Sequence, residues 1–344
     1  MDYQIASKTE VGTKKAEYEP NGDWCKCLER ENCVVLTLAD GLGSCASDAR
    51  AAHTACDDFI EKCASALDHN EVLDEAALIR FCSEIDPVLA NRNDKTCFSV
   101  VVWYTNTNQV IWFNVGDTRI YKYNWSGAWT QMTVDDRAVE NKKSNNPKYG
   151  TYHTDHGALI PSVGVDCALG DCKLEFHTGS FAFSPGESIV MCSDGMYHSA
   201  TFFDDTAQLL GTIDMEEAIK RIETNDTDDH TLLVIRRNMT VDTSLDELMA
   251  QFEQNPNVLP RHVMIESLCE GLEQMLHEDA DANNIAKVAA FMKLHQLYPV
   301  KQRIDSLYNA AVKKLKATPQ GEEWQRLNTA SIDLKEVLQY VFRH

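Results

Sequence analysis

Short apolar segments separated by polar turns recur through residues 1–240 and predict β-strands. The short polar links at 105–108 and 124–127 are typical of hairpin turns, so the strands are expected to pair in antiparallel fashion. A polar stretch at 138–157 predicts a long loop, and we interpret its His153 and His156 as solvated side chains. The predicted strands span residues 3–7, 23–28, 33–39, 96–104, 109–115, 119–123, 129–133, 174–183, 188–193 and 230–237.

Amphipathic helices are predicted between these strands. Apolar residues recur at steps of three and four in segments 49–63 and 73–89, and shorter helical patterns occur at 203–210 and 215–223. Helices placed between two groups of antiparallel strands predict an α+β fold. We therefore expect two packed antiparallel β-sheets flanked by α-helices.

The pattern changes after residue 238, where strand-like segments give way to amphipathic helices separated by prolines. We place a domain boundary near Val241, giving domains 1–240 and 241–344. The second domain is expected to be an all-α bundle that positions substrates, binds a protein partner or docks on the first domain. Its predicted helices span 245–252, 263–276, 285–297, 304–315 and 324–342.

Composition narrows the classes of partner. The 344 residues carry a net charge of −21, which disfavours nucleic acid or an anionic membrane surface as the main partner and suits a protein that concentrates cations. No apolar run approaches the roughly 20 residues of a membrane span, and the N-terminus lacks a signal-peptide pattern. The 12 cysteines show no paired zinc-ligand spacing and are expected to be reduced thiols of a cytoplasmic protein.

Aspartates stand where several apolar runs end, at Asp40, Asp117 and Asp194, and Asp228-Asp229 opens the last predicted strand. A carboxylate beside a buried strand is costly unless a partner compensates its charge. Most of these sites have no Lys or Arg beside them, so the partner is expected to be a cation. Oxygen-only ligands suit Mg²⁺ or Mn²⁺ better than zinc.

The order of these motifs resembles the PPM/PP2C family of metal-dependent serine/threonine phosphatases. Any one motif is weak, because Asp-Gly is a common turn dipeptide, but six in order form a specific signal. The segments that carry the resemblance are Asn21-Gly22-Asp23, Ala39-Asp40-Gly41-Leu42-Gly43, Asn114-Val115-Gly116-Asp117-Thr118-Arg119, Met132-Thr133-Val134-Asp135-Asp136, Cys192-Ser193-Asp194-Gly195-Met196 and Asp228-Asp229-His230-Thr231.

The resemblance implies hydrolysis of phosphoserine or phosphothreonine in proteins at a centre of two Mg²⁺ or Mn²⁺ ions. It implies that Asp40 bridges both ions, with the Gly41 carbonyl helping. Asp194 and Asp228 would complete the shell of one ion and Asp23 would hold water on the other, while Asp117 would serve a third, weaker site found in some members. A hydroxide between two such ions attacks phosphorus in line, so no covalent intermediate is expected.

Some positions depart from the family pattern. Gly22-Asp23 stands where members usually carry an acidic pair. Lys14 and Lys15 are the nearest cations to the position of an arginine that binds the substrate phosphate in many members, and lysine cannot reproduce its bidentate contact. His198 replaces an aspartate, which makes it a candidate for proton donation or for weak binding of a third metal.

Several alternatives stay open at this stage. Asp229 is the alternative to Asp228 as the ligand, and Asp117 could pair with Arg119 instead of binding a cation. The alternative for the whole protein is a catalytically inactive member of the family that acts as an interaction module through its C-terminal helices. Retention of the aspartates at Asp40, Asp194 and Asp228 favours the enzyme.

Overall fold

The computed structural model describes residues 3–13, 15, 19–124, 127–136, 141–144, 152–154, 168–170, 176–212, 214–222, 227–239, 243–256, 259–277, 281–299 and 301–341. The chain forms two compact units. One comprises Met1–Leu210 and Met215–Arg237, and the other comprises Gly211–Asp214 and Asn238–His344.

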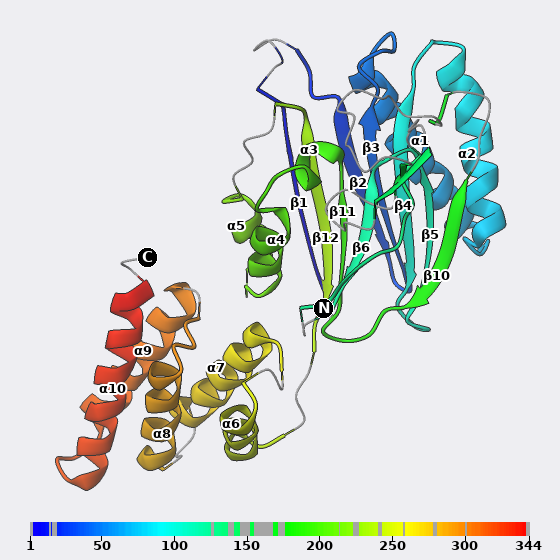
Figure 1. Cartoon of the computed structure of the whole chain (residues 1–344). Coiled ribbons are helices and arrows are strands. Elements are labelled where there is room, and N and C mark those ends of the chain that lie inside the picture. The colour runs from blue at the N-terminus through cyan, green and yellow to red at the C-terminus, as the bar shows by residue number, and fades with distance from the viewer. Residues whose placement is uncertain are drawn as a thin grey trace. The chain divides into compact units, whose positions relative to one another are not determined.

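Two five-stranded antiparallel sheets form the centre of the first unit (Figure 1). One sheet has the order β1 (Tyr3–Glu10), β12 (His230–Arg237), β11 (Ser188–Cys192), β6 (Arg119–Tyr123) and β7 (Trp129–Gln131). The other has the order β10 (His177–Ala182), β5 (Gln109–Val115), β4 (Thr96–Tyr104), β3 (Cys33–Gly41) and β2 (Asp23–Arg30).

A hydrophobic core lies between the two sheets. Leu36 of β3 and Trp103 of β4 pack in it with Met191 of β11 and Ile235 of β12. The opposite faces of β3 and β4 are buried as well, by residues such as Val35. These central strands are continuously apolar because both of their faces are covered.

Helices cover the outer face of each sheet (Figure 1). Helices α1 (Asp48–Asp68) and α2 (Glu75–Ala90) pack on the sheet that contains β3, and the side chain of Ser47 caps the first turn of α1. The short helices α3 (Asp194–Tyr197), α4 (Phe202–Leu210) and α5 (Met215–Ile219) pack on the other sheet. The predicted α+β sandwich is confirmed.

Two local features differ from the sequence prediction. The predicted loop 138–157 contains a two-stranded ribbon of β8 (Asn141–Ser144) and β9 (Tyr152–Thr154), which an apolar pattern could not reveal because the stretch is polar. Helix α3 was not predicted because its four residues are too few for helical periodicity. The side chain of His153, and His156 altogether, lie outside the described residues.

The second unit is helical. Its elements are α6 (Leu245–Gln254), α7 (Arg261–His277), α8 (Ala282–Leu294), α9 (Lys301–Ala317) and α10 (Glu322–Val341). Residues such as Leu268, Met292 and Leu307 form a core of its own. The predicted C-terminal helical region is confirmed.

Disulfides and membrane-spanning helices can be assessed for the described residues only. Every cysteine that the structure describes has a free thiol. In the same part of the chain, no helix combines the length and the apolar character that crossing a membrane requires.

Candidate metal centre

Asp23 and Asp40 face each other at the ends of neighbouring strands, because β2 and β3 pair in a register that sets them opposite. The side chain of Asp23 is fully buried. Its Oδ2 accepts a hydrogen bond of 2.6 Å from Ser193 Oγ. Its Oδ1 is buried and has no hydrogen-bond partner among the described residues, so one carboxylate oxygen is available to a cation.

Neighbouring carboxylates raise the pKa values of both Asp40 and Asp23. Burial and the charges of Asp23, Asp194, Asp117 and Asp228 raise the pKa of Asp40 well above its usual range. Burial raises the pKa of Asp23 to about 7, against the opposing hydrogen bond from Ser193 and with added repulsion from Asp229 and Asp228. The structure therefore brings the five aspartates that the sequence singled out close enough for the charges of the other four to act on Asp40.

Close backbone approach explains why glycine follows two of these aspartates. A Cβ on Gly41 would lie 2.2 Å from the backbone oxygen of Asp48, and one on Gly195 would lie 2.1 Å from that of Asp229. Neither glycine has a positive φ. These Asp-Gly pairs therefore serve close packing at the strand ends, and the simple turn interpretation does not account for them.

Asp117 lies in the turn between β5 and β6, where several contacts fix it. Cys97 Sγ donates to its Oδ1 over 3.1 Å, and the Tyr197 hydroxyl donates to its backbone oxygen over 3.1 Å. Arg119 forms a fully buried ion pair with Asp135, at 2.7 Å, and lies over the ring of Tyr197. Arg119 therefore has a carboxylate partner in Asp135.

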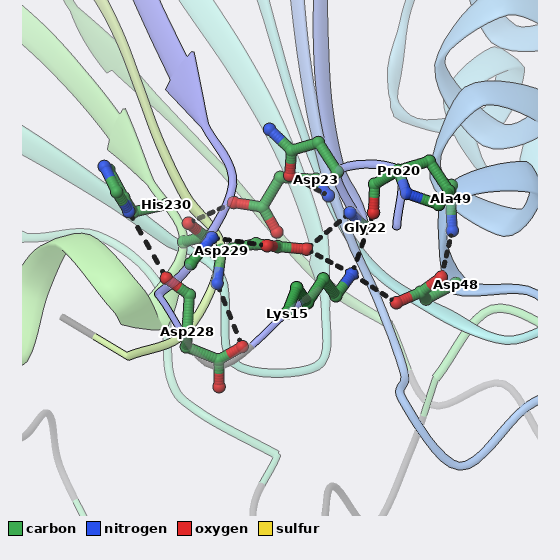
Figure 2. A network of polar contacts seen from close by, with 12 residues as sticks. Lys15, Pro20, Gly22, Asp23, Asp48, Ala49, Asp228, Asp229 and His230 are labelled. Carbon is green, nitrogen blue, oxygen red and sulfur yellow. Dashed lines mark hydrogen bonds and ion pairs between the residues drawn. The ribbon is translucent and has the colours of Figure 1, made fainter. Parts of the chain in front are cut away.

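Asp228 and Asp229 have different environments (Figure 2). Asp229 is buried, and its oxygens accept hydrogen bonds from the backbone N–H groups of Gly12, at 2.8 Å, and Gly22, at 2.5 Å. Its Oδ2 also lies 2.5 Å from Lys15 Nζ. Asp228 is exposed, and its Oδ1 accepts the backbone N–H of Asp229. The carboxylate of Asp229 is thus engaged by Lys15 and by two backbone N–H groups, and the choice of Asp228 as the cation ligand stays a prediction.

The remaining predicted site residues lie as follows. His198 Nδ1 is 4.0 Å from Asp194 Oδ2, so the imidazole stands beside the cluster. Lys15 contacts carboxylates, and its contact with a substrate phosphate stays a prediction. Lys14 lies outside the described residues.

Sequence reasoning missed Ser193 and Asp48. Ser193 holds Asp23 and also accepts the backbone N–H of Thr231 at 2.9 Å. Asp48 is the acidic first residue of α1, and only its position after the helix cap at Ser47 distinguished it in the sequence. Ser193 and Asp48 contact residues that are distant in the chain, so the sequence around each of them does not indicate its role.

The donor set fits a hard divalent cation, because the converging side chains supply oxygen only. Within the described residues, no group of three or more His, Cys, Asp or Glu side chains is arranged so that it could hold a metal ion as it stands. The partnerless oxygen of Asp23 and the repulsion around Asp40 are what a cation would relieve. The residues therefore fit Mg²⁺ or Mn²⁺ in donor chemistry.

A family model, described as protein phosphatase 2C, matches residues 13–225, which include every aspartate of the cluster except Asp228. The chain belongs to the protein phosphatase 2C family. No curated protein matches the sequence.

Solved structures of PPM phosphatases share the fold. The PPM Ser-Thr phosphatase MsPP from Mycobacterium smegmatis is 19% identical, with a TM-score of 0.53 over 68% of this chain and 98% of that one. The catalytic domain of the serine/threonine phosphatase PstP, solved with two manganese ions, is 19% identical, with a TM-score of 0.51 over 69% and 99%. The S. agalactiae serine/threonine phosphatase is 16% identical, with a TM-score of 0.51 over 69% and 100%. The helical part of the second unit, Asn238–His344, lies outside the family match.

Proposed function

We propose that this protein hydrolyses phosphoserine and phosphothreonine in proteins, in a reaction that depends on Mg²⁺ or Mn²⁺. The observation that carries the proposal is the convergence of five aspartates within a protein phosphatase 2C fold, where burial and neighbouring carboxylates raise the pKa of Asp23 and of Asp40. Two divalent ions bound at such a cluster lower the pKa of a bound water and balance the charge of the reacting phosphate.

The residues of the cluster would have the following roles. Asp40, the Gly41 carbonyl, Asp194 and Asp228 would hold the two ions, and Asp23 would orient water on one of them. Ser193 fixes the Asp23 carboxylate through its 2.6 Å hydrogen bond. Asp117 would serve a third cation site.

One further feature supports a reaction without a covalent intermediate. Burial raises the pKa of Cys97, whose thiol donates to Asp117, and of Cys192, which directly precedes Ser193, and a raised pKa disfavours the thiolate form that a nucleophile needs. His198 lies beside Asp194, where a protonated imidazole would donate its proton to the leaving oxygen, which departs as the alcohol, and return to the neutral form.

Metal-dependent turnover tests the proposal. Purified protein should hydrolyse p-nitrophenyl phosphate and a phosphothreonine peptide in the presence of Mn²⁺, and EDTA should abolish both activities. The matched control is Asp40→Asn, prepared and assayed in the same way. Wild-type protein that binds no divalent ion and shows no turnover above this control would refute the proposal.

The alternative is a catalytically inactive member that acts as an interaction module through α6–α10. The observation that favours it is the ammonium of Lys15, which already neutralises part of the acidic network. Protein that folds and binds a partner through the helical unit, yet gives no turnover with either substrate at any Mn²⁺ concentration, would favour this alternative.

A further inference from the structure

The ammonium group of Lys15 is completely engaged within the protein (Figure 2). An ammonium has three N–H donors. Lys15 Nζ lies 2.6 Å from Asp48 Oδ2, 2.5 Å from Asp229 Oδ2 and 3.1 Å from the backbone oxygen of Pro20. Its side chain is 21% exposed. Three acceptors therefore take up the three donors, which leaves none to bind a substrate phosphate in this arrangement.

The two carboxylates meet beside Gly22. A Cβ on Gly22 would lie 2.9 Å from Asp229 Oδ2 and 2.9 Å from Asp48 Oδ2. A larger residue there would push the two carboxylate groups away from their present positions, so Gly22 leaves room for both of them. Two like charges this close need a cation between them.

Each member of this group comes from a different part of the fold. Lys15 belongs to the segment between β1 and β2, Asp48 begins α1, and Asp229 directly precedes β12. Asp229 also accepts the backbone N–H of Gly22, which adjoins Asp23. The ion pairs of Lys15 therefore tie three segments together directly beside the candidate metal centre.

We propose that Asp48 and Asp229 form a cation site that the chain fills with its own Lys15. Lys15 is then a positioning residue that fixes Gly22 and the start of β12, and it is not the ligand of the substrate phosphate. Without the ammonium, the carboxylate pair takes up a divalent ion from solution. The inference rests on the proposed function only in placing a metal centre next to this pair.

Thermal unfolding of Lys15→Met tests the site directly. In EDTA this variant should melt about 4–8 °C below wild type, because it leaves two neighbouring carboxylates without a counter-ion. Millimolar Mn²⁺ should raise its melting temperature by several degrees more than it raises that of wild type. The extra rise should disappear in Lys15→Met/Asp48→Asn, which lacks one carboxylate. Lys26→Met is the matched control, because Lys26 forms a surface ion pair of 2.8 Å with Asp57 of α1, and it should melt within about 2 °C of wild type.

Phosphate affinity separates positioning from substrate binding. At saturating Mn²⁺, the dissociation constant of inorganic phosphate should differ by less than about twofold between wild type and Lys15→Met. Loss of a phosphate contact worth about 1.4 kcal/mol would instead raise this constant about tenfold. A rise of tenfold or more, without the extra Mn²⁺ stabilisation, would make Lys15 a phosphate ligand and overturn the inference. If Lys15→Met does not fold, Lys15→Gln keeps two donors without the charge and is used in the same comparison.

Failure of the inference is distinguishable from failure of the proposed function. Wild-type protein whose melting temperature does not respond to Mn²⁺ would count against the metal centre. The Mn²⁺ rescue of Lys15→Met, measured against the double variant, would still decide whether Asp48 and Asp229 form a cation site. Equal Mn²⁺ responses in Lys15→Met and the double variant would refute it.

Discussion

At the scale of single residues, Asp40 has an unfavourable electrostatic environment, since burial and four neighbouring carboxylates all oppose its ionisation. We expect Asp40→Asn and Asp194→Asn each to lower Mn²⁺-dependent turnover by at least about 10²-fold, because each removes a charged ligand of the proposed centre. Folding should survive, since the change also relieves repulsion. Steady-state kinetics measures turnover, and circular dichroism checks that each variant is folded.

The control is Cys27→Ser, which alters an exposed thiol and should keep full turnover. An inactive but folded Cys27→Ser, together with an active Asp40→Asn, would indicate thiol chemistry.

The raised pKa of Asp23 predicts how the metal-free protein responds to pH. Its pKa rises from an ordinary 3.8 to about 7 on folding, so the folded state holds a proton that the unfolded state releases. Stability therefore falls as pH rises from about 4 to about 7, by at most about 1.4 kcal/mol per pH unit for one group. Urea unfolding in EDTA should show a shallower decline in Asp23→Asn than in wild type over this window. Equal slopes would mean that Asp23 does not titrate as its burial indicates.

At the scale of elements, the turn between β5 and β6 depends on Gly116. This residue has a φ of +92°, and a Cβ on it would lie 2.5 Å from Cys97 Sγ. Gly127 is a matched case, since its φ is +93° but nothing lies within 4 Å of a Cβ. We expect Gly127→Ala to cost about 1 kcal/mol of unfolding free energy from backbone strain alone. Gly116→Ala should cost roughly 1–3 kcal/mol more from overlap and should displace Asp117. Urea unfolding of both variants measures the difference, and equal costs would show that the contact with Cys97 is easily relieved.

At the scale of the whole molecule, the chain has separate cores. The residues that bury the faces of α6–α10 form a hydrophobic cluster of their own, apart from the clusters that line the sheets. The function of the helical unit is not tested by the family match, and its role in positioning substrates or binding a partner stays a prediction.

Expression of residues 1–240 tests that prediction. Because the sheets carry their own cores, we expect this fragment to fold and to hydrolyse p-nitrophenyl phosphate within about threefold of the full chain, a difference of less than 1 kcal/mol in the barrier. Turnover of phosphoproteins should change if the helices position substrates. An insoluble fragment would show that the helices complete the fold, and unchanged turnover of every substrate would exclude a role in catalysis.

The sequence by itself determined most of the elements and the principal aspartates. The apolar run of β3 and the spacing of apolar residues by three and four in α1 could be recognised in the sequence, because each element must bury one or both of its faces. The ordered motifs around Asp40, Asp117 and Asp194 could be found because each lies within a few residues of a predicted strand end. The short helix α3 and the polar ribbon of β8 and β9 carry too little periodicity to be predicted.

Only the tertiary structure decided which charges meet. Lys15 is 33 residues from Asp48 and 214 residues from Asp229 in the chain, yet its ammonium joins both. Likewise, Ser193 reaches Asp23 across 170 residues. A residue's type and its neighbours in sequence fix which contacts it can make, but strand register and the approach of the Asp48 and Asp229 side chains at Gly22 fix which of them form. That the carboxylate of Asp229 is engaged by Lys15 and by the backbone N–H groups of Gly12 and Gly22 therefore had to come from the fold.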